Sequence, residues 1–165
     1  MKKLVVLSIC VLLLQACSGG KEYAYNEKTA DLFLKTMNVV DERYQELQGG
    51  AFDGSNSDKF DYEARFKKAQ RIASYGAEMK ALLEELQPSE EAQNFHEQVG
   101  EYMLIVKDQY GPLFVRYVEA TDSLEKSKIR EEINLKNIML TAQADKSLQV
   151  QQEYFKRVGL QATEE

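Results

Sequence analysis

The sequence predicts an all-α protein that folds as an antiparallel four-helix bundle with up-down-up-down topology. Apolar residues recur at steps of three and four in every long segment after residue 25, which is the spacing of an amphipathic helix. No segment alternates apolar and polar residues between turn signals, as a half-buried strand does. Two of the three expected connections are short, and short connections favour antiparallel neighbours.

The first helix is expected over residues 25–48, and Gly49 and Gly50 end it. Residues 51–58 are rich in glycine, serine, asparagine and aspartate and are predicted to form a loop. The inner face of this helix is expected to consist of Ala30, Phe33, Met37, Val40, Tyr44 and Leu47.

The second helix is expected over residues 60–87, because Pro88 restricts the residue before it to extended conformations. Ser89 is the expected N-cap of the third helix, with Glu90 and Glu91 well placed against its positive N-terminal end. The inner face of the second helix is expected to consist of Phe66, Ala69, Ile72, Gly76, Met79, Leu83 and Leu86.

The third helix is interrupted by Gly111-Pro112. A proline within a helix removes one hydrogen bond and clashes with the carbonyl four residues earlier, at a cost of roughly 3 kcal/mol. We therefore expect this helix to be kinked or broken near Gly111-Pro112. Its inner face is expected to consist of Phe95, Val99, Tyr102, Val106, Leu113 and Tyr117.

The last helix begins at Asp122-Ser123-Leu124-Glu125, which has the pattern of a capping box. It is expected to run to residue 158, where Gly159 can supply a left-handed cap, and residues 160–165 are expected to be a frayed tail. The inner face is expected to consist of Ile129, Ile133, Leu140, Ala144, Leu148, Phe155 and Val158.

The N-terminal segment has the features of a secretory signal. Lys2 and Lys3 precede an apolar run over residues 4–14, which is too short to cross a bilayer core of about 30 Å but has the length of a signal-peptide apolar region. The run ends in Leu14-Gln15-Ala16-Cys17, which resembles the lipobox of bacterial lipoproteins. The alternative is an ordinary secretory peptide in which the cysteine occurs by chance.

The lipobox resemblance implies cleavage between Ala16 and Cys17 and attachment of lipid to the Cys17 thiol. It divides the chain into a signal peptide (1–16), a lipidated cysteine with a flexible tether (17–24) and a bundle domain (25–159). One acyl chain binds a membrane only marginally, whereas two or three anchor it stably. Because Cys10 is removed with the signal peptide, the mature chain has no free thiol for a disulfide.

The charge of the chain restricts its partners. Removal of Lys2 and Lys3 takes the net charge from −6 to −8, which argues against nucleic acid and against electrostatic attraction to anionic lipid. By analogy with lipoprotein sorting, Ser18 after the cysteine favours the outer membrane over the inner one; which face it occupies stays open. Tyr23 and Tyr25 are expected to lie at the lipid headgroups.

No pattern of catalytic or metal-binding residues is found, so we expect neither an enzyme nor a cofactor. The chain has one histidine, His96, which is expected to be a solvated surface residue, and Gln93 stands where a Glu-x-x-His metal motif needs glutamate. The sequence lacks a nucleophile elbow and a phosphate-binding loop. Pairs of neighbouring glutamates, which are expected to lie on solvated helix faces, occur at Glu84-Glu85, Glu90-Glu91 and Glu131-Glu132.

Two glycines raise a second hypothesis, a cavity in the middle of the bundle. Gly76 and Gly100 lie twelve residues either side of Pro88, so a hairpin turning there would place them at the same height. Each costs up to about 1 kcal/mol relative to alanine, which indicates either close backbone approach or a cavity for a small apolar or amphipathic ligand. Asn137 and Gln151, near the inner face of the last helix, would set the packing register or line that cavity.

The lipobox, the short polar segment ending in Tyr25-Asn26-Glu27-Lys28 and the Leu86-Gln87-Pro88 end of the second helix resemble a group of poorly characterised bacterial surface lipoproteins with a small helical-bundle domain. The resemblance implies a lipid-anchored envelope protein that acts as a non-enzymatic interaction or structural module. Its expected partners are the membrane, through Cys17, and an envelope protein. The alternative hypothesis is a binding protein for a ligand in the mid-bundle cavity.

Overall fold

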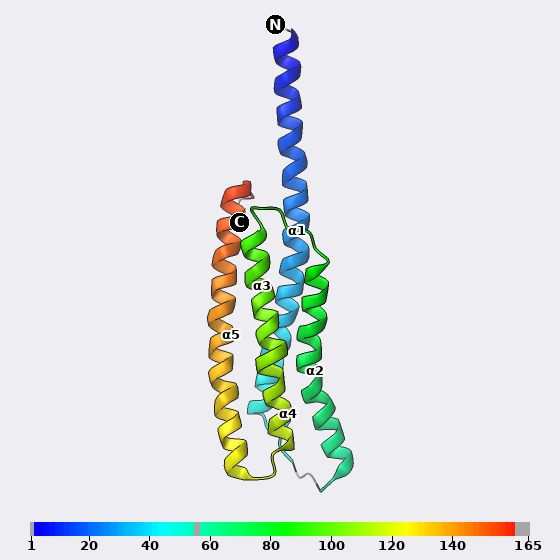
Figure 1. Ribbon diagram of the computed structural model, residues 1–165, viewed down its shortest axis with the longest axis vertical. Helices are drawn as coiled ribbons and strands as arrows, with labels where there is room; N and C mark the ends of the chain where they lie inside the picture. Colours follow the sequence, from blue (N-terminus) through cyan, green and yellow to red (C-terminus); the bar gives the residue numbers. More distant parts are fainter. Residues whose placement is uncertain (1, 55–56, 161–165) are drawn as a thin grey trace.

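The computed structural model describes residues 2–54 and 57–160, with side chains from Gly20 onward. The described residues form no strand, and their helices pack as the predicted antiparallel four-helix bundle (Figure 1). Three consecutive segments together make the third helix of the bundle. The elements in chain order are α1 (Lys2–Gln48), α2 (Lys59–Glu84), α3 (Gln93–Ile105), the π-helical segment η1 (Val106–Tyr110), α4 (Gly111–Glu119) and α5 (Ser123–Val158).

α1 starts before the expected residue 25. Residues 20–24 are helical, although they were expected to belong to a flexible tether. The expected apolar face is confirmed, since Phe33, Val40 and Leu47 are buried. Thr36 is buried among them, and its hydroxyl donates to the carbonyl of Leu32, four residues earlier, so the helix itself satisfies this polar group (2.8 Å).

α2 starts at a strong N-cap and ends three residues earlier than expected. The carboxylate of Asp58 accepts hydrogen bonds from the backbone N–H groups of Phe60 and Asp61, which the helix cannot satisfy. After Glu84 the chain turns through residues 85–92. Ser89 is not the N-cap of the third helix, as was expected: α3 begins at Gln93 with Ala92 in the N-cap position, and the Ser89 hydroxyl instead accepts from the backbone N–H of Ala92 within the connection (3.2 Å).

The kink expected near Gly111-Pro112 is confirmed and takes the form of a π-helical turn. The backbone N–H of Gly111 donates to the carbonyl of Val106, five residues earlier, instead of the carbonyl four residues earlier. This wider turn lies directly before Pro112, the residue that would clash with a regular preceding turn. All six residues expected on the inner face of the third helix are buried.

α2 and the third helix approach each other closely where they cross (Figure 1). A Cβ atom on Gly111 would lie 2.5 Å from the backbone nitrogen of Ala73, and one on Gly76 would lie 2.9 Å from the backbone nitrogen of Lys107. Real Cβ atoms do not come so close to backbone atoms. The absence of a side chain at Gly76 and Gly111 therefore permits this packing.

α5 begins and ends as predicted. Asp122 is the N-cap and accepts from the N–H groups of Leu124 and Glu125, and Gly159 closes the helix with φ 72°. The expected inner face is wrong at Leu148, which is exposed, while Ser147 and Tyr154 are buried. The hydroxyl of Ser147 donates to the carbonyl of Gln143, so a polar residue takes the inner position that Leu148 was expected to hold (2.9 Å). Residues 161–165 of the expected tail lie outside the described residues.

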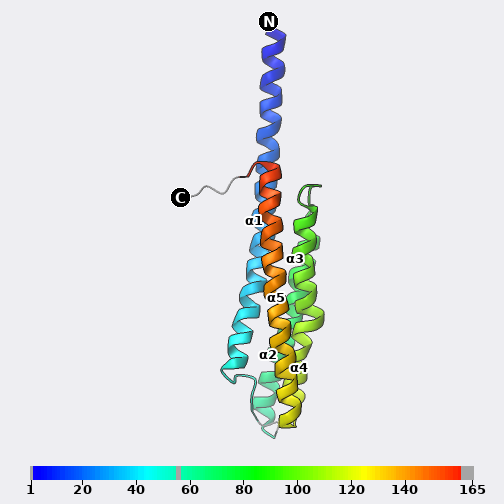
Figure 2. The ribbon, with the colours of Figure 1, turned by 90° about the vertical axis from the view of Figure 1, so that its left-hand side faces the viewer.

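The loop between α1 and α2 begins at the lower end of the bundle (Figure 2). Phe52 is fully buried against Phe114 of α4, with the ring centroids 5.1 Å apart. Arg65 is buried as well and donates to the Phe52 carbonyl and to Asp61. Asp53 accepts from the Tyr117 hydroxyl at 2.5 Å. Phe52 therefore belongs to the core, and Asp53 connects the described start of this loop to α4.

Candidate functional site

The expected lipidation site, Ala16 and Cys17, lies outside the residues whose side chains the structure describes. The first firmly held side chain after it is Glu22 of α1. The hydroxyl of Tyr154 donates to the Glu22 carboxylate at 2.6 Å and to the Glu22 carbonyl at 2.9 Å, and Ser89 donates to the same carboxylate at 3.1 Å. Three distant parts of the chain thus meet at Glu22, and no local pattern in the sequence signals this.

Two further contacts join the start of α1 to the other helices at the same end of the bundle. The Tyr25 hydroxyl lies 2.8 Å from Nδ1 of His96, and Gln151 donates to the side-chain oxygen of Asn26 at 2.7 Å. Together with Glu22, Ser89 and Tyr154, these residues form what we call the terminal polar cluster. His96 is half-buried rather than a solvated surface residue, and Tyr25 points to the bundle instead of standing free for lipid headgroups.

Burial changes the acidity of three groups in the terminal polar cluster, and it raises the pKa of Tyr25. Burial, with a smaller contribution from the charge of Lys80, lowers the pKa of His96. Burial and the hydrogen bond to Glu22 raise the pKa of Tyr154, so its phenol keeps its proton and remains a donor. The cluster is therefore arranged to hold α1 against the bundle.

The four residues expected around a mid-bundle cavity are not brought together. Gly76 faces the backbone of Lys107, whereas Gly100 faces the side chains of Lys80 and Leu83. Gly100 and Lys107 are about two helical turns apart, or about 10 Å, so the two glycines do not share a height. The expected register was wrong because the facing positions of α2 and the third helix are not centred on Pro88: Gly76 faces Lys107 and Gly100 faces Leu83, and both pairs are centred between residues 91 and 92.

The two polar residues of that hypothesis also lie apart. Gln151 bonds to Asn26 in the terminal polar cluster. Asn137 is half-buried near the middle of α5, and its carbonyl accepts from the Thr141 hydroxyl. At Gly76 the contact with the Lys107 backbone shows that close backbone approach, and not a ligand cavity, explains the glycine.

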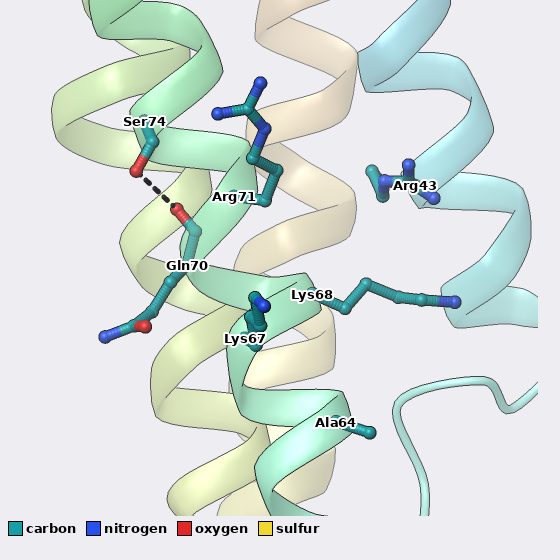
Figure 3. A pocket seen from close by; sticks show the side chains of 7 residues that line it. All are labelled: Arg43, Ala64, Lys67, Lys68, Gln70, Arg71 and Ser74. Atoms are coloured by element: carbon teal, nitrogen blue, oxygen red, sulfur yellow. Dashed lines mark hydrogen bonds between the residues drawn. The ribbon is translucent and has the colours of Figure 1, made fainter.

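A groove of about 550 Å³ between α1 and α2 carries a concentration of positive charge (Figure 3). Lys68 points across from α2 toward α1, where Arg43 lies on the facing helix (Figure 3). No acidic side chain lines it. We call it the basic groove, and it is lined by Arg43, Ala64, Lys67, Lys68, Gln70, Arg71 and Ser74.

The cations of the basic groove differ in how far the chain neutralises them. Glu46 accepts from Arg43 and from Lys68 (2.9 Å to the Lys68 nitrogen), and Arg71 lies 3.3 Å from Glu78. Burial opposes ionisation of Glu46, but the two hydrogen bonds outweigh it and lower the pKa of this carboxyl. Lys67 is exposed and has no ion pair among the described residues.

The carboxylate pairs singled out in the sequence lie on the surface. Glu84, Glu85, Glu131 and Glu132 are exposed, and a hydrogen bond from Lys80 lowers the pKa of Glu84, whereas a general acid at neutral pH needs a raised one. Glu90 and Glu91 are exposed too. Within the described part of the chain, no three His, Cys, Asp or Glu side chains are grouped so that they could hold a metal ion. In that same part, no helix combines the length and the hydropathy needed to span a membrane.

A scan against protein-family models and searches of curated proteins and of solved structures found no match to this chain. The resemblance to surface lipoproteins therefore stays a prediction that depends on the lipobox and the helical architecture.

Proposed function

We propose that this chain is a lipid-anchored lipoprotein of the bacterial envelope, acting as a non-enzymatic interaction module. The observation that carries the proposal is the order of its N-terminal features: two lysines, an eleven-residue apolar run and Leu14-Gln15-Ala16-Cys17. The Cys17 thiol would carry the lipid. Ser18 in the next position favours the outer membrane.

The terminal polar cluster supports this proposal because it lies close to Cys17 in the chain. Glu22, which is bonded to Tyr154 and Ser89, stands only five positions after Cys17. Five residues span at most about 17 Å even when fully extended. An anchor on Cys17 would therefore hold this end of the bundle next to the bilayer and leave the long sides of the helices free for a partner.

A role in binding is supported by the chemistry of the described surface. The lining of the basic groove includes four cations and no acid, while the glutamate pairs considered for catalysis are exposed. Such a surface can recognise a partner but offers no paired acid and base to move a proton.

Metabolic labelling with an alkyne analogue of palmitate tests the anchor. The wild-type chain and Cys10→Ser should incorporate label, because Cys10 lies in the segment to be removed, while Cys17→Ser should incorporate none. Globomycin, which inhibits the lipoprotein signal peptidase, should cause the uncleaved precursor to accumulate. Equal labelling of Cys17→Ser and wild type would disprove lipidation at this residue.

A further inference from the structure

We infer that the basic groove binds an acidic peptide segment of a protein partner, an inference that rests on the proposed function as an interaction module. The partner segment would present two or more carboxylates to Lys67 and Arg71 and one apolar side chain to the neighbouring Phe60. The charge, the existing carboxylate contacts and the apolar end of the surface each support this assignment.

The first support is charge complementarity. The chain as a whole has a net charge of −6, yet four cations and no acids line this one groove. Lys67 has no ion pair among the described residues, and Arg71 has one exposed pair with Glu78 at 3.3 Å. An exposed pair of this kind is worth less than about 1 kcal/mol, so an incoming carboxylate can replace it.

The second support is that two of the four lining cations already bind a carboxylate, although that carboxylate does not itself line the groove. Glu46 lies between Arg43 and Lys68 and bonds to both, so one carboxylate joins the two walls of the groove. In Figure 3, Lys68 extends toward α1, and Lys67 and Arg71 lie farther from α1 on the same helix. These two cations are the ones that an external carboxylate would contact. Ser74 and Gln70 also line this end of the groove, where the Ser74 hydroxyl donates to the Gln70 carbonyl (3.1 Å; Figure 3).

The third support is an apolar surface in line with the cations. Phe60, Ala64, Lys67 and Arg71 follow steps of four, three and four, which places them along one face of α2. Phe60 is 85 % exposed, an unusual position for a phenylalanine. Aromatic residues and arginine are the types enriched in protein interfaces.

These features favour a short acidic peptide over a polyanionic polymer. The stripe from Phe60 to Arg71 covers about 16 Å of helix, which matches a few residues of peptide. A long polymer of high charge density would also meet the acidic remainder of the surface, where it would be repelled. A peptide can combine sparse carboxylates with an apolar side chain that contacts Phe60.

The test uses the whole protein purified in a non-ionic detergent, so its result does not depend on whether Cys17 is lipidated. The probe is a fluorescein-labelled peptide of about twelve residues that contains several glutamates and one leucine, and binding is measured by fluorescence anisotropy. Failure of palmitate labelling would remove the anchor without affecting this measurement. Failure of peptide binding would remove the groove assignment without affecting the anchor.

Two variants with the same change in charge separate the groove from the overall charge. Lys67→Glu with Arg71→Glu should weaken binding at least tenfold, which is about 1.4 kcal/mol. Lys128→Glu with Lys146→Glu, at exposed positions of α5, should change it less than twofold. Circular dichroism checks that both variants keep their helices. Equal weakening by the two variants, or no binding to wild type, would overturn the inference.

Phe60→Ser distinguishes a peptide partner from a polyanion. This variant should weaken peptide binding several-fold, and the affinity of wild type should fall as salt is raised because screening acts on exposed charges. If Phe60→Ser bound the peptide as tightly as wild type, and inorganic polyphosphate competed as well as unlabelled peptide, the groove would be a general polyanion site and the peptide assignment would be wrong.

Discussion

The hydroxyl of Tyr154, near the end of α5, donates a hydrogen bond of 2.6 Å to the carboxylate of Glu22, near the start of the described side chains. The two residues are 132 positions apart in the chain, and Tyr154 is fully buried. Hydrogen bonds to a charged group contribute roughly 1.5–3 kcal/mol. This contact therefore joins the first and last helices of the bundle at the end that would face the membrane.

Tyr154→Phe should lower the free energy of unfolding by about 1.5–3 kcal/mol, because it removes one donor to Glu22 and keeps the aromatic packing. Urea unfolding followed by circular dichroism measures the change. Tyr23→Phe is the matched control: Tyr23 is 60 % exposed and should change stability by less than about 0.5 kcal/mol. Equal effects of the two substitutions would contradict a special role for Tyr154.

Gly76→Ala and Gly100→Ala should change stability in opposite directions. At Gly76 the new methyl group would meet the Lys107 backbone at 2.9 Å, so the helices must separate, at a cost of about 1–3 kcal/mol. At Gly100 the nearest atom is Cε of Lys80 at 3.3 Å, a flexible side chain that can move. There alanine should stabilise the helix by up to about 1 kcal/mol. Thermal unfolding of both variants measures these changes. A destabilised Gly100→Ala together with a neutral Gly76→Ala would refute the explanation that backbone contact requires glycine at position 76.

Arg65→Ala should release the loop between α1 and α2. Arg65 is 4 % exposed and its side chain donates to the Phe52 carbonyl, so its removal leaves a buried acceptor unpaired and should cost about 2–3 kcal/mol. Limited proteolysis should show faster cleavage within residues 49–58. The control is Lys59→Ala, which removes only an exposed ion pair with Glu63 and should leave cleavage unchanged.

Folding stability should fall as the pH drops from about 7 to 5, because of His96. Its pKa in the folded chain is lowered by burial and by Lys80, so the unfolded chain binds a proton more readily. The contribution of neutral His96 to the free energy of unfolding is fully present above the ordinary histidine pKa of about 6.5. It is lost as the pH falls through the lowered pKa of the folded chain. His96 is the single histidine of the chain, and most carboxyls titrate below this range.

His96→Gln isolates this effect because glutamine keeps an oxygen that can accept from the Tyr25 hydroxyl. The melting temperature of wild type should decrease more than that of His96→Gln between pH 7 and pH 5. The same decrease in both proteins would show that groups other than His96 cause the pH dependence.

The bundle could be predicted from the sequence because its signals are local. Asp122 and Gly159 mark the ends of α5 by their own chemistry, and the apolar spacing of Phe33, Val40 and Leu47 identifies the buried face of α1. Pro112 likewise predicted an irregular third helix, although the sequence alone could not distinguish a π-helical turn from a break.

Contacts between distant residues could not be predicted. The register of α2 against α3 depends on how residues 85–92 turn, and an error of a few residues there placed Gly76 and Gly100 at one height. The burial of Ser147 could not be predicted from apolar spacing, because serine is polar. Its hydroxyl can be buried because it donates to a carbonyl of its own helix. Helix faces were visible in the sequence, but the pairing of Glu22 with Tyr154 required the folded arrangement.

The close crossing of α2 and the third helix also limits how this sequence can diverge. Because backbone atoms lie next to one another at Ala73, Gly76 and Gly111, larger residues at these three positions would require the helices to move apart. Relatives that keep this bundle should therefore retain small residues there, even when their surfaces have changed completely. The pattern Ala-x-x-Gly in one helix and Gly-Pro in the next is thus a short signature by which distant members of this lineage could be recognised.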